Sequence, residues 1–422
     1  MRQNRGVNIL DDLQWRGLIQ ESTDIDALRK HLDSKQVVFY VGFDPTASSL
    51  HIGHLTQVLT ARRLQLAGLA PVLLVGGATG QIGDPRESTE RVLNSPETVA
   101  GWVDAIREQV RPFVSFDGAN AATLVNNLDW TGNISAVDFF RDVGKHFSVN
   151  RMLAREVVKA RLESGISFTE FSYQLLQAND YYELFRRHGV TLQFGGSDQW
   201  GNITAGVDYV RRRGEGPVHA FVTPLVTKAD GTKFGKSEGD AVWLDAGLTS
   251  PYSFYQFWIN ADDRDIGNYV RYFSFKSHEE ITELEKATAE KPAARLAQRA
   301  LASELTTIVH GESECAQAIA ASSALFGRGD LAELAETTLE AALDEAGCIP
   351  AEGEMSVAAA FKETGLVKSL SEARRAAKEG GAYVNNTRVA DVDAPFAPEQ
   401  FLHGRLAVLR RGKKTIAGVK RL

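Results

Sequence analysis

Two histidines flank a glycine in the stretch DPTASSLHIGHL, residues 44–55. The preceding run VVFYVGF is β-branched and aromatic and predicts a strand, whereas the apolar spacing after it predicts a helix. His51 and His54 are therefore expected at the start of a helix, where unpaired backbone N–H groups and the helix dipole favour an anion. Because Gly53 has no side chain, a flat nucleotide base can approach the backbone there. The stretch predicts a contact with a nucleotide and its phosphates.

The histidine pair also has an interpretation as half of a metal site. No third ligand lies nearby in the sequence, so we expect no protein-bound metal. Structural histidines are the remaining alternative.

A second candidate is the glycine-punctuated basic loop TKADGTKFGKSEGD, residues 227–240, which carries Lys233, Lys236 and Ser237. Two lysines on a loop can close over a polyphosphate and neutralise the charge that develops on a departing pyrophosphate. Taken alone, such a stretch is more often a solvated surface loop. It is not a Walker loop, because the pattern G-x-x-x-x-G-K-[ST] is absent.

The bulk composition is that of a globular protein of two or three domains, with 422 residues, 43% of them hydrophobic. The net charge of −7 argues against wholesale coating of nucleic acid, but the terminal stretch RLAVLRRGKKTIAGVKRL carries only basic charges and leaves a local contact open. Cys315 and Cys348 are far apart and suggest neither a disulfide framework nor a zinc site. With no signal peptide and no membrane-spanning run, we expect a cytoplasmic protein.

The order of predicted elements divides the chain into four parts. Residues 1–248 alternate strands and helices, which predicts a doubly wound parallel-sheet (Rossmann-like) α/β domain with ligand sites beyond the carboxyl ends of the strands. Residues 249–330 are predicted to form an α-helical domain, and residues 331–354 a linker. Residues 355–422 predict a small α+β module with a basic helix face.

HIGH near the amino terminus and KFGKS well downstream resemble the two signatures of class I aminoacyl-tRNA synthetases. YVGFDPTASSLHIGHL, VGGATGQIGDP, FTEFSYQLLQANDYY and GGSDQWGNI extend the resemblance, over nearly the whole chain, to the bacterial tyrosyl-tRNA synthetases. The resemblance implies two steps: tyrosine and ATP give tyrosyl-adenylate and pyrophosphate, and the tyrosyl group then moves to the terminal adenosine of tRNA(Tyr). It also implies Mg²⁺ accompanying ATP and a homodimer with subunit contacts near FFRDVGKHFSVNRM.

The resemblance further implies a role for each member of a set of site residues. Groups that stabilise charge on the phosphates are Thr46, His51, His54, Lys233 and Lys236. Groups that bind tyrosine are Tyr40 and Asp180 at its hydroxyl, Asp84, Tyr173 and Gln177 at its ammonium, and Gln199 near its carboxylate or the adenylate linkage. Groups around ATP and the adenylate are Gly42, Asp44, Gly53, Gly196, Asp198 and Ser237. The terminal module resembles a small RNA-binding domain shared with a ribosomal protein.

Three positions depart from the family pattern. The loop after Asp84, residues 85–91, is apparently one residue shorter and lacks a lysine, which puts a phosphate role for its arginines in doubt. Asn179 stands where an aromatic residue is expected, and Asn386 where glycine is frequent.

Three rival functions remain at this point: a tryptophanyl relative, a small-molecule nucleotidyltransferase, and a non-catalytic RNA-binding protein. The pairing of Tyr40 with Asp180 disfavours the first, and the basic terminal module disfavours the second. The intact histidine and lysine motifs disfavour the third.

Overall fold

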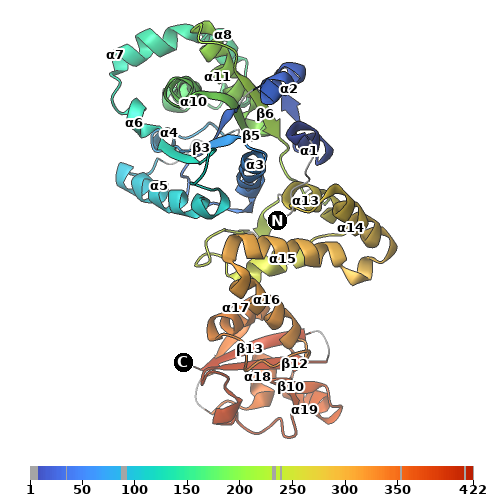
Figure 1. Ribbon diagram of the computed structural model, residues 1–422. Coiled ribbons are helices and arrows are strands. Elements are labelled where there is room, and N and C mark those ends of the chain that lie inside the picture. The colour runs from blue at the N-terminus through green and yellow to red at the C-terminus, as the bar shows by residue number, and fades with distance from the viewer. Residues whose placement is uncertain are drawn as a thin grey trace. The chain divides into compact units, whose positions relative to one another are not determined.

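The computed structural model describes residues 8–34, 36–86, 93–230, 234–237, 240–351, 354–412 and 415–421, and at residues 34, 236, 237 and 240 the backbone alone (Figure 1). The chain divides into two compact units. The first comprises Met1–Asp245 and Gly267–Glu283, and the second Ala246–Ile266 and Leu284–Leu422.

The first unit is built on a six-stranded sheet in the order β1-β6-β5-β2-β3-β4. All neighbouring strands are parallel except β1 and β6. The strands are β1 (Glu21–Ser22), β2 (Val38–Phe43), β3 (Ala70–Val75), β4 (Thr123–Asn126), β5 (Val190–Gly196) and β6 (His219–Thr223). Because β2 lies between β3 and β5, the chain crosses over in opposite directions from it, and ligands bind beyond such a switch point.

Helices cover both faces of this sheet, with α3 and α5 on one side and α10 and α11 on the other (Figure 1). The helices before residue 213 are α1 (Ile9–Trp15), α2 (Ile25–Ser34), α3 (Leu55–Leu66), α4 (Thr79–Ile82), α5 (Pro96–Val110), α6 (Leu128–Thr131), α7 (Ala136–Asp138), α8 (Val149–Leu153), α9 (Glu156–Arg161), α10 (Phe168–His188) and α11 (Trp200–Arg212). The predicted doubly wound α/β domain is confirmed.

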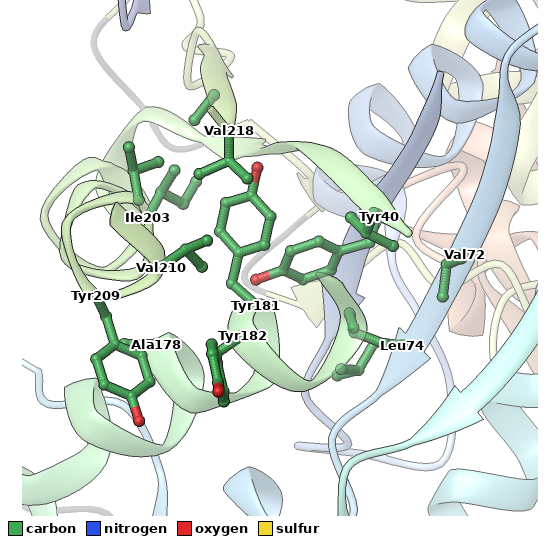
Figure 2. Close-up of a cluster of buried hydrophobic side chains, with 14 of the residues drawn as sticks. Tyr40, Val72, Leu74, Ala178, Tyr181, Tyr182, Ile203, Tyr209, Val210 and Val218 are labelled. Carbon is green, nitrogen blue, oxygen red and sulfur yellow. The ribbon is translucent and has the colours of Figure 1, made fainter. Parts of the chain in front are cut away.

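The helix α10 is bounded by two local signals. The Ser167 side chain accepts from the Glu170 backbone N–H at its start, and Gly189 adopts the left-handed conformation at its end. Between them the helix buries a stripe against β2 and α11, where the Tyr40 and Tyr181 rings meet edge to face at 5.3 Å between centroids (Figure 2). This contact places one face of α10 directly over the central strand.

The second unit joins helices to a five-stranded mixed sheet in the order β11-β10-β12-β13-β9. Its helices are α12 (Pro251–Ile259), α15 (Leu296–His310), α16 (Glu312–Ala324), α17 (Glu336–Ala346), α18 (Val357–Glu363) and α19 (Leu370–Lys378). Its strands are β9 (Cys348–Ala351), β10 (Ala382–Val384), β11 (Thr387–Arg388), β12 (Leu406–Arg411) and β13 (Thr415–Arg421). Two helices, α13 (Ile266–Phe273) and α14 (His278–Glu290), lie where the chain passes between the units.

The segment 331–354, predicted to be a linker, contains α17 and β9. Leu339 and Leu343 of α17 are buried in one core with Leu406 and Val408 of β12. Strand β9 pairs in parallel with β13. Apolar residues at helical spacing explain the difference, because they give this Ala- and Glu-rich segment a face to bury. The other predicted domain boundaries stay predictions.

Candidate active site

The carboxyl ends of four parallel strands deliver polar residues to one edge of the sheet. Asp44 follows β2, Thr79 follows β3, Asn127 follows β4, and Asp198 follows β5. A helix begins soon after each of these strands, so backbone N–H groups also face that edge.

Asp180 of α10 is a buried carboxylate held by two side-chain donors. Asn127 Nδ2 donates to its Oδ2 at 3.0 Å, and Trp130 Nε1 donates to its Oδ1 at 2.8 Å. Burial raises the pKa of Asp180 to about 7, because the two hydrogen bonds to the charged form only partly offset the loss of water. The carboxyl group is therefore close to half ionised at neutral pH.

The same hydrogen-bond chain continues to Asp44. The Asn127 amide also donates to Thr79 Oγ1 at 3.0 Å, and the Thr79 hydroxyl donates to Asp44 Oδ1 at 2.7 Å. Tyr173, two turns before Asp180 on the same face of α10, donates its hydroxyl to Asp44 Oδ2 at 2.6 Å. The predicted site carboxylates Asp180 and Asp44 are thus connected through hydrogen bonds of Asn127 and Thr79.

The Tyr40 hydroxyl is buried and has no hydrogen-bond partner among the described residues. Burial, followed by the nearby Asp180 carboxylate, raises the pKa of this phenol well above its usual value. It is therefore a neutral donor at neutral pH. A buried hydroxyl without a partner is costly in a folded protein, which marks this atom as one that a ligand can satisfy.

Asp84 lies in a second polar cluster with Gln199. Gln199 Nε2 donates to one Asp84 oxygen at 2.8 Å, and Asn202 Nδ2 donates to the other at 3.1 Å. Burial raises the pKa of the Asp84 carboxyl, against the lowering effect of these two bonds. The Gln177 Oε1 atom is buried and unpaired within the described part of the chain. These groups suit a ligand cation such as an ammonium.

The two histidines of HIGH open the helix as predicted, through a short 3-10 turn, Ile52–His54. His51 Nδ1 accepts from the Gly53 backbone N–H at 3.0 Å, and His54 Nδ1 accepts from the His51 backbone N–H at 3.2 Å. Burial lowers the pKa of His51 and lowers that of His54 to about 3. Both rings are neutral at pH 7, and since Nδ1 accepts, each proton lies on Nε2.

The backbone of the second signature lies beside the first. The Val242 N–H donates to Gly235 O, and the Ile52 N–H donates to Val242 O, both at 2.9 Å. Gly235 has φ +87°, and a side chain there would lie 3.2 Å from Ile52 Cγ1. The structure therefore brings KFGKS to HIGH. Strand β7 (Lys236–Ser237) pairs with β8 (Asp240–Ala241).

Some predicted residues are placed only in part. Lys233 lies outside the described residues, as do positions 87–91 of the shortened loop, and the side chains of Lys236 and Ser237 are not described. Thr46, Gly42, Gly53 and Asp198 are exposed at the edge, and Gly196 is buried beside Asp198. Their roles stay predictions.

Two departures from the family pattern are visible. Asn179 is buried next to Asp180, and its Nδ2 has no partner among the described residues. Asn386 adopts a left-handed turn at φ +62°, as asparagine tolerates.

Sequence reasoning missed four residues of the site: Thr79, Asn127, Trp130 and Asn202. The stretch TLVNN carried a signal for Asn127, because its apolar and β-branched residues favour a strand and Asn127 is its last residue. Trp130 and Asn202 lie on helices, where their reach depends on tertiary packing.

In the described ranges no group of three or more His, Cys, Asp or Glu side chains gathers as metal ligands would. No described helix is long and apolar enough to cross a bilayer.

Comparison with known proteins agrees with this geometry. Residues 32–327 match the family model of class I tRNA synthetases (W and Y), and residues 340–417 match the tyrosine–tRNA ligase SYY-like C-terminal domain. The chain therefore belongs to the class I tRNA synthetases.

Similar proteins show which group within this family the chain belongs to. The chain is 62% identical to the tyrosine–tRNA ligase of Streptomyces coelicolor over 98% of this chain and 99% of that protein. It is 59% identical to that of Acidothermus cellulolyticus over 98% and 99%. A truncated mitochondrial tyrosyl-tRNA synthetase from Aspergillus nidulans matches with a TM-score of 0.68 at 30% identity, over 75% of this chain and 93% of that chain. Within the family, the chain is a member of the tyrosine–tRNA ligases.

Gly76, between β3 and α4, is expected to be intolerant of a side chain. A Cβ atom there would lie 2.1 Å from Thr79 Oγ1 and 2.3 Å from Asp44 Oδ1. Gly76→Ala should lower the free energy of unfolding by about 1–3 kcal/mol, as overpacking does elsewhere. Gly42→Ala is the matched control, because its Cβ would make only an ordinary contact, 3.6 Å from Leu74 Cδ2. Equal urea midpoints for the two variants would contradict this prediction.

Proposed function

We propose that this chain activates L-tyrosine with ATP to form tyrosyl-adenylate and pyrophosphate, and then transfers the tyrosyl group to the 3′-terminal adenosine of tRNA(Tyr). One observation carries the proposal. The buried Tyr40 hydroxyl has no partner among the described residues, and it lies under the electrostatic influence of the buried Asp180 carboxylate. Together they supply one donor and one acceptor, which is what a phenol requires.

The substrate phenol donates to Asp180 and accepts from Tyr40. Phenylalanine would leave both protein groups buried and unpaired, and tyrosyl-tRNA synthetases are the standard worked example of this discrimination. A tryptophan indole offers a donor but no acceptor for the Tyr40 hydroxyl. The arrangement therefore favours tyrosine over both other aromatic amino acids.

The amino-acid end is held by the other polar clusters. The substrate ammonium is bound by Asp84, Tyr173 and Gln177, and its carboxylate lies near Gln199. The unpaired Gln177 Oε1 and the raised pKa of Asp84 support this assignment, because both are relieved by a cation. The ribose and amine side of the adenylate lies over Gly42, Asp44, Gly196 and Asp198.

In the activation step a tyrosine carboxylate oxygen attacks the α-phosphorus of ATP, and the bond from that phosphorus to the bridging oxygen breaks to release pyrophosphate. His51 and His54 donate Nε2–H to phosphate oxygens, with Thr46 beside them. Lys233, Lys236 and Ser237 meet the β- and γ-phosphates. Mg²⁺ arrives with ATP as part of the substrate. Alignment and charge stabilisation, without a covalent enzyme intermediate, supply the rate enhancement.

The terminal module contacts tRNA phosphates. On α19, Arg375 and Lys378 are exposed, whereas Arg374 pairs with Asp393 at 2.9 Å. Exposed cations on one helix position RNA without reading its bases. A cytoplasmic location accords with these partners.

The chain acts as a homodimer. Between residues 137 and 168 five large apolar side chains are exposed: Val137, Phe140, Val149, Leu162 and Phe168. The rings of Phe140 and Phe168 lie 6.1 Å apart. Apolar side chains gathered in this way typically mark an association surface.

Tyrosine-dependent exchange of labelled pyrophosphate into ATP tests the proposal. The wild-type protein should exchange with tyrosine and not with phenylalanine or tryptophan, and Asp180→Ala should lose most of that exchange. Exchange with tryptophan alone would identify the tryptophanyl relative. Absence of exchange with every amino acid would favour the alternative of a non-catalytic RNA-binding protein.

Tyrosine affinity should depend on pH through Asp180. The carboxylate form accepts the phenol, and burial raises its pKa to about 7. Its population rises from about one tenth at pH 6 to about nine tenths at pH 8, so the apparent Kd should fall about ninefold. Asp180→Asn, which does not titrate, should bind weakly with a flat profile. The pKa of His54, at about 3, keeps that ring from titrating in this range. A flat wild-type profile in calorimetry would refute this assignment.

Phe168→Asp should convert the homodimer to monomers, because it places a charge in the proposed subunit contact. Light scattering after size-exclusion chromatography measures the mass directly. Leu248→Asp is the matched control, since Leu248 is also a large exposed apolar residue but lies outside residues 137–168. A wild-type protein that elutes as a monomer, or a dimeric Phe168→Asp variant, would overturn the proposed surface.

A further inference from the structure

Two buried arginines cap the carboxyl end of α13. Arg16 donates from Nη1 to the carbonyl oxygens of Arg271 at 3.2 Å and Ser274 at 3.0 Å, and from Nη2 to that of Lys276 at 2.8 Å. A helix leaves its last carbonyls unpaired and partly negative, so cations there are stabilising. Arg16 is only 2% exposed, so this is a contact of the interior.

Arg63 of α3 reaches the same helix end. Its Nη2 donates to the carbonyl oxygens of Ser274 and, at 3.4 Å, of Tyr272, and its guanidinium lies 4.3 Å from the centre of the Phe275 ring. Helix α3 begins directly after the HIGH motif. The element that opens with the histidines therefore also holds α13.

The Arg16 guanidinium is itself fixed from behind. Asp12 accepts two bonds from Arg16 Nε, each at 3.0 Å, and also contacts His278 Nε2 at 2.7 Å. The His278 ring stacks on Trp15 at 3.7 Å between centroids. This arrangement leaves Arg16 little freedom to move away from α13.

Aromatic side chains of α13 contact the KFGKS segment. The Phe234 ring stacks on Phe273 at 5.7 Å and 11°, and lies 5.2 Å from the Tyr269 ring. The next residue, Gly235, rests against Ile52 of the HIGH motif. Phe234 thus anchors the KFGKS segment by packing against α13.

We infer that Arg16 and Arg63 are positioning residues for the activation step, acting through α13 and Phe234 on the backbone that carries Lys236. Neither arginine touches substrate. They fix the position of α13 relative to α3. The distance between the HIGH and KFGKS motifs depends on that position. The inference rests on the proposed function, because the HIGH and KFGKS motifs contact phosphates only if ATP is the substrate.

The experiment compares Arg63→Met and Arg16→Met with wild type in the exchange assay, in full-length protein. Each variant should lose about tenfold to a hundredfold in kcat, the range expected for displaced catalytic groups, while the tyrosine Kd stays within about twofold. Arg63→Lys should recover part of the loss, since an ammonium can still donate to Ser274 O. Arg29→Met is the control, because Arg29 forms a partly exposed ion pair with Asp11 of α1 at 2.8 Å.

A double-variant cycle with Phe234→Ala separates positioning from general destabilisation. If Arg63 acts through Phe234, the loss in Arg63→Met with Phe234→Ala should be smaller than the product of the two single losses. Multiplicative losses, an unchanged kcat, or parallel losses of tyrosine binding and melting temperature would overturn the inference. Should Arg63→Met fail to fold, Arg63→Lys with Phe234→Ala gives the same comparison. Absence of exchange in wild type would instead refute the proposed function.

Discussion

The structure depends on holding one partly ionised carboxyl group, that of Asp180, inside the protein. Asp180 has lost its water, and its ionised form persists only because Asn127 and Trp130 donate to both oxygens. Since Asn127 also binds Thr79, which in turn binds Asp44, the ends of three strands and the middle of α10 must meet within hydrogen-bond distance. A shift of any one of these elements would leave a buried charge or hydrogen-bond donor without its partner. The fold around the sheet edge is thus specified by polar contacts as much as by its apolar core.

The same loss of water decides how each group can act. His51 and His54 are neutral, so they provide oriented N–H donors and no positive charge. In the proposed function, the lysines of the second signature and the Mg²⁺ that accompanies ATP compensate the charge of the polyphosphate. That division of labour makes the spacing between HIGH and KFGKS a quantity the fold has to control. Hydrogen bonds from Ile52 through Val242 to Gly235 set that spacing on one side.

Most of the sheet and the helix starts could be predicted, because they follow from local patterns. The strand before Asp44, the helix after HIGH and the parallel order each arise from short-range periodicity and the crossover rule. The partners of Asp180 could not, since Trp130 and Asp180 are 50 residues apart and their meeting depends on how α6 and α10 pack. The predicted linker failed for a related reason. Its Ala- and Glu-rich composition resembles a connector, and only the core that receives Leu339 and Leu343 makes it a helix of the second unit.

Unpaired polar atoms in the candidate site have an energetic consequence. The Tyr40 hydroxyl and Gln177 Oε1 are buried without partners in the described part of the chain, and each such atom costs about 1–3 kcal/mol of stability. In the proposed function, a tyrosine molecule pairs with both atoms and recovers this free energy on binding, whereas phenylalanine recovers only the part at its ammonium. The cost of leaving these atoms unpaired is therefore also a source of selectivity. A variant that filled these atoms with internal partners would be more stable and less discriminating, because the same hydrogen bonds cannot serve both the fold and the substrate.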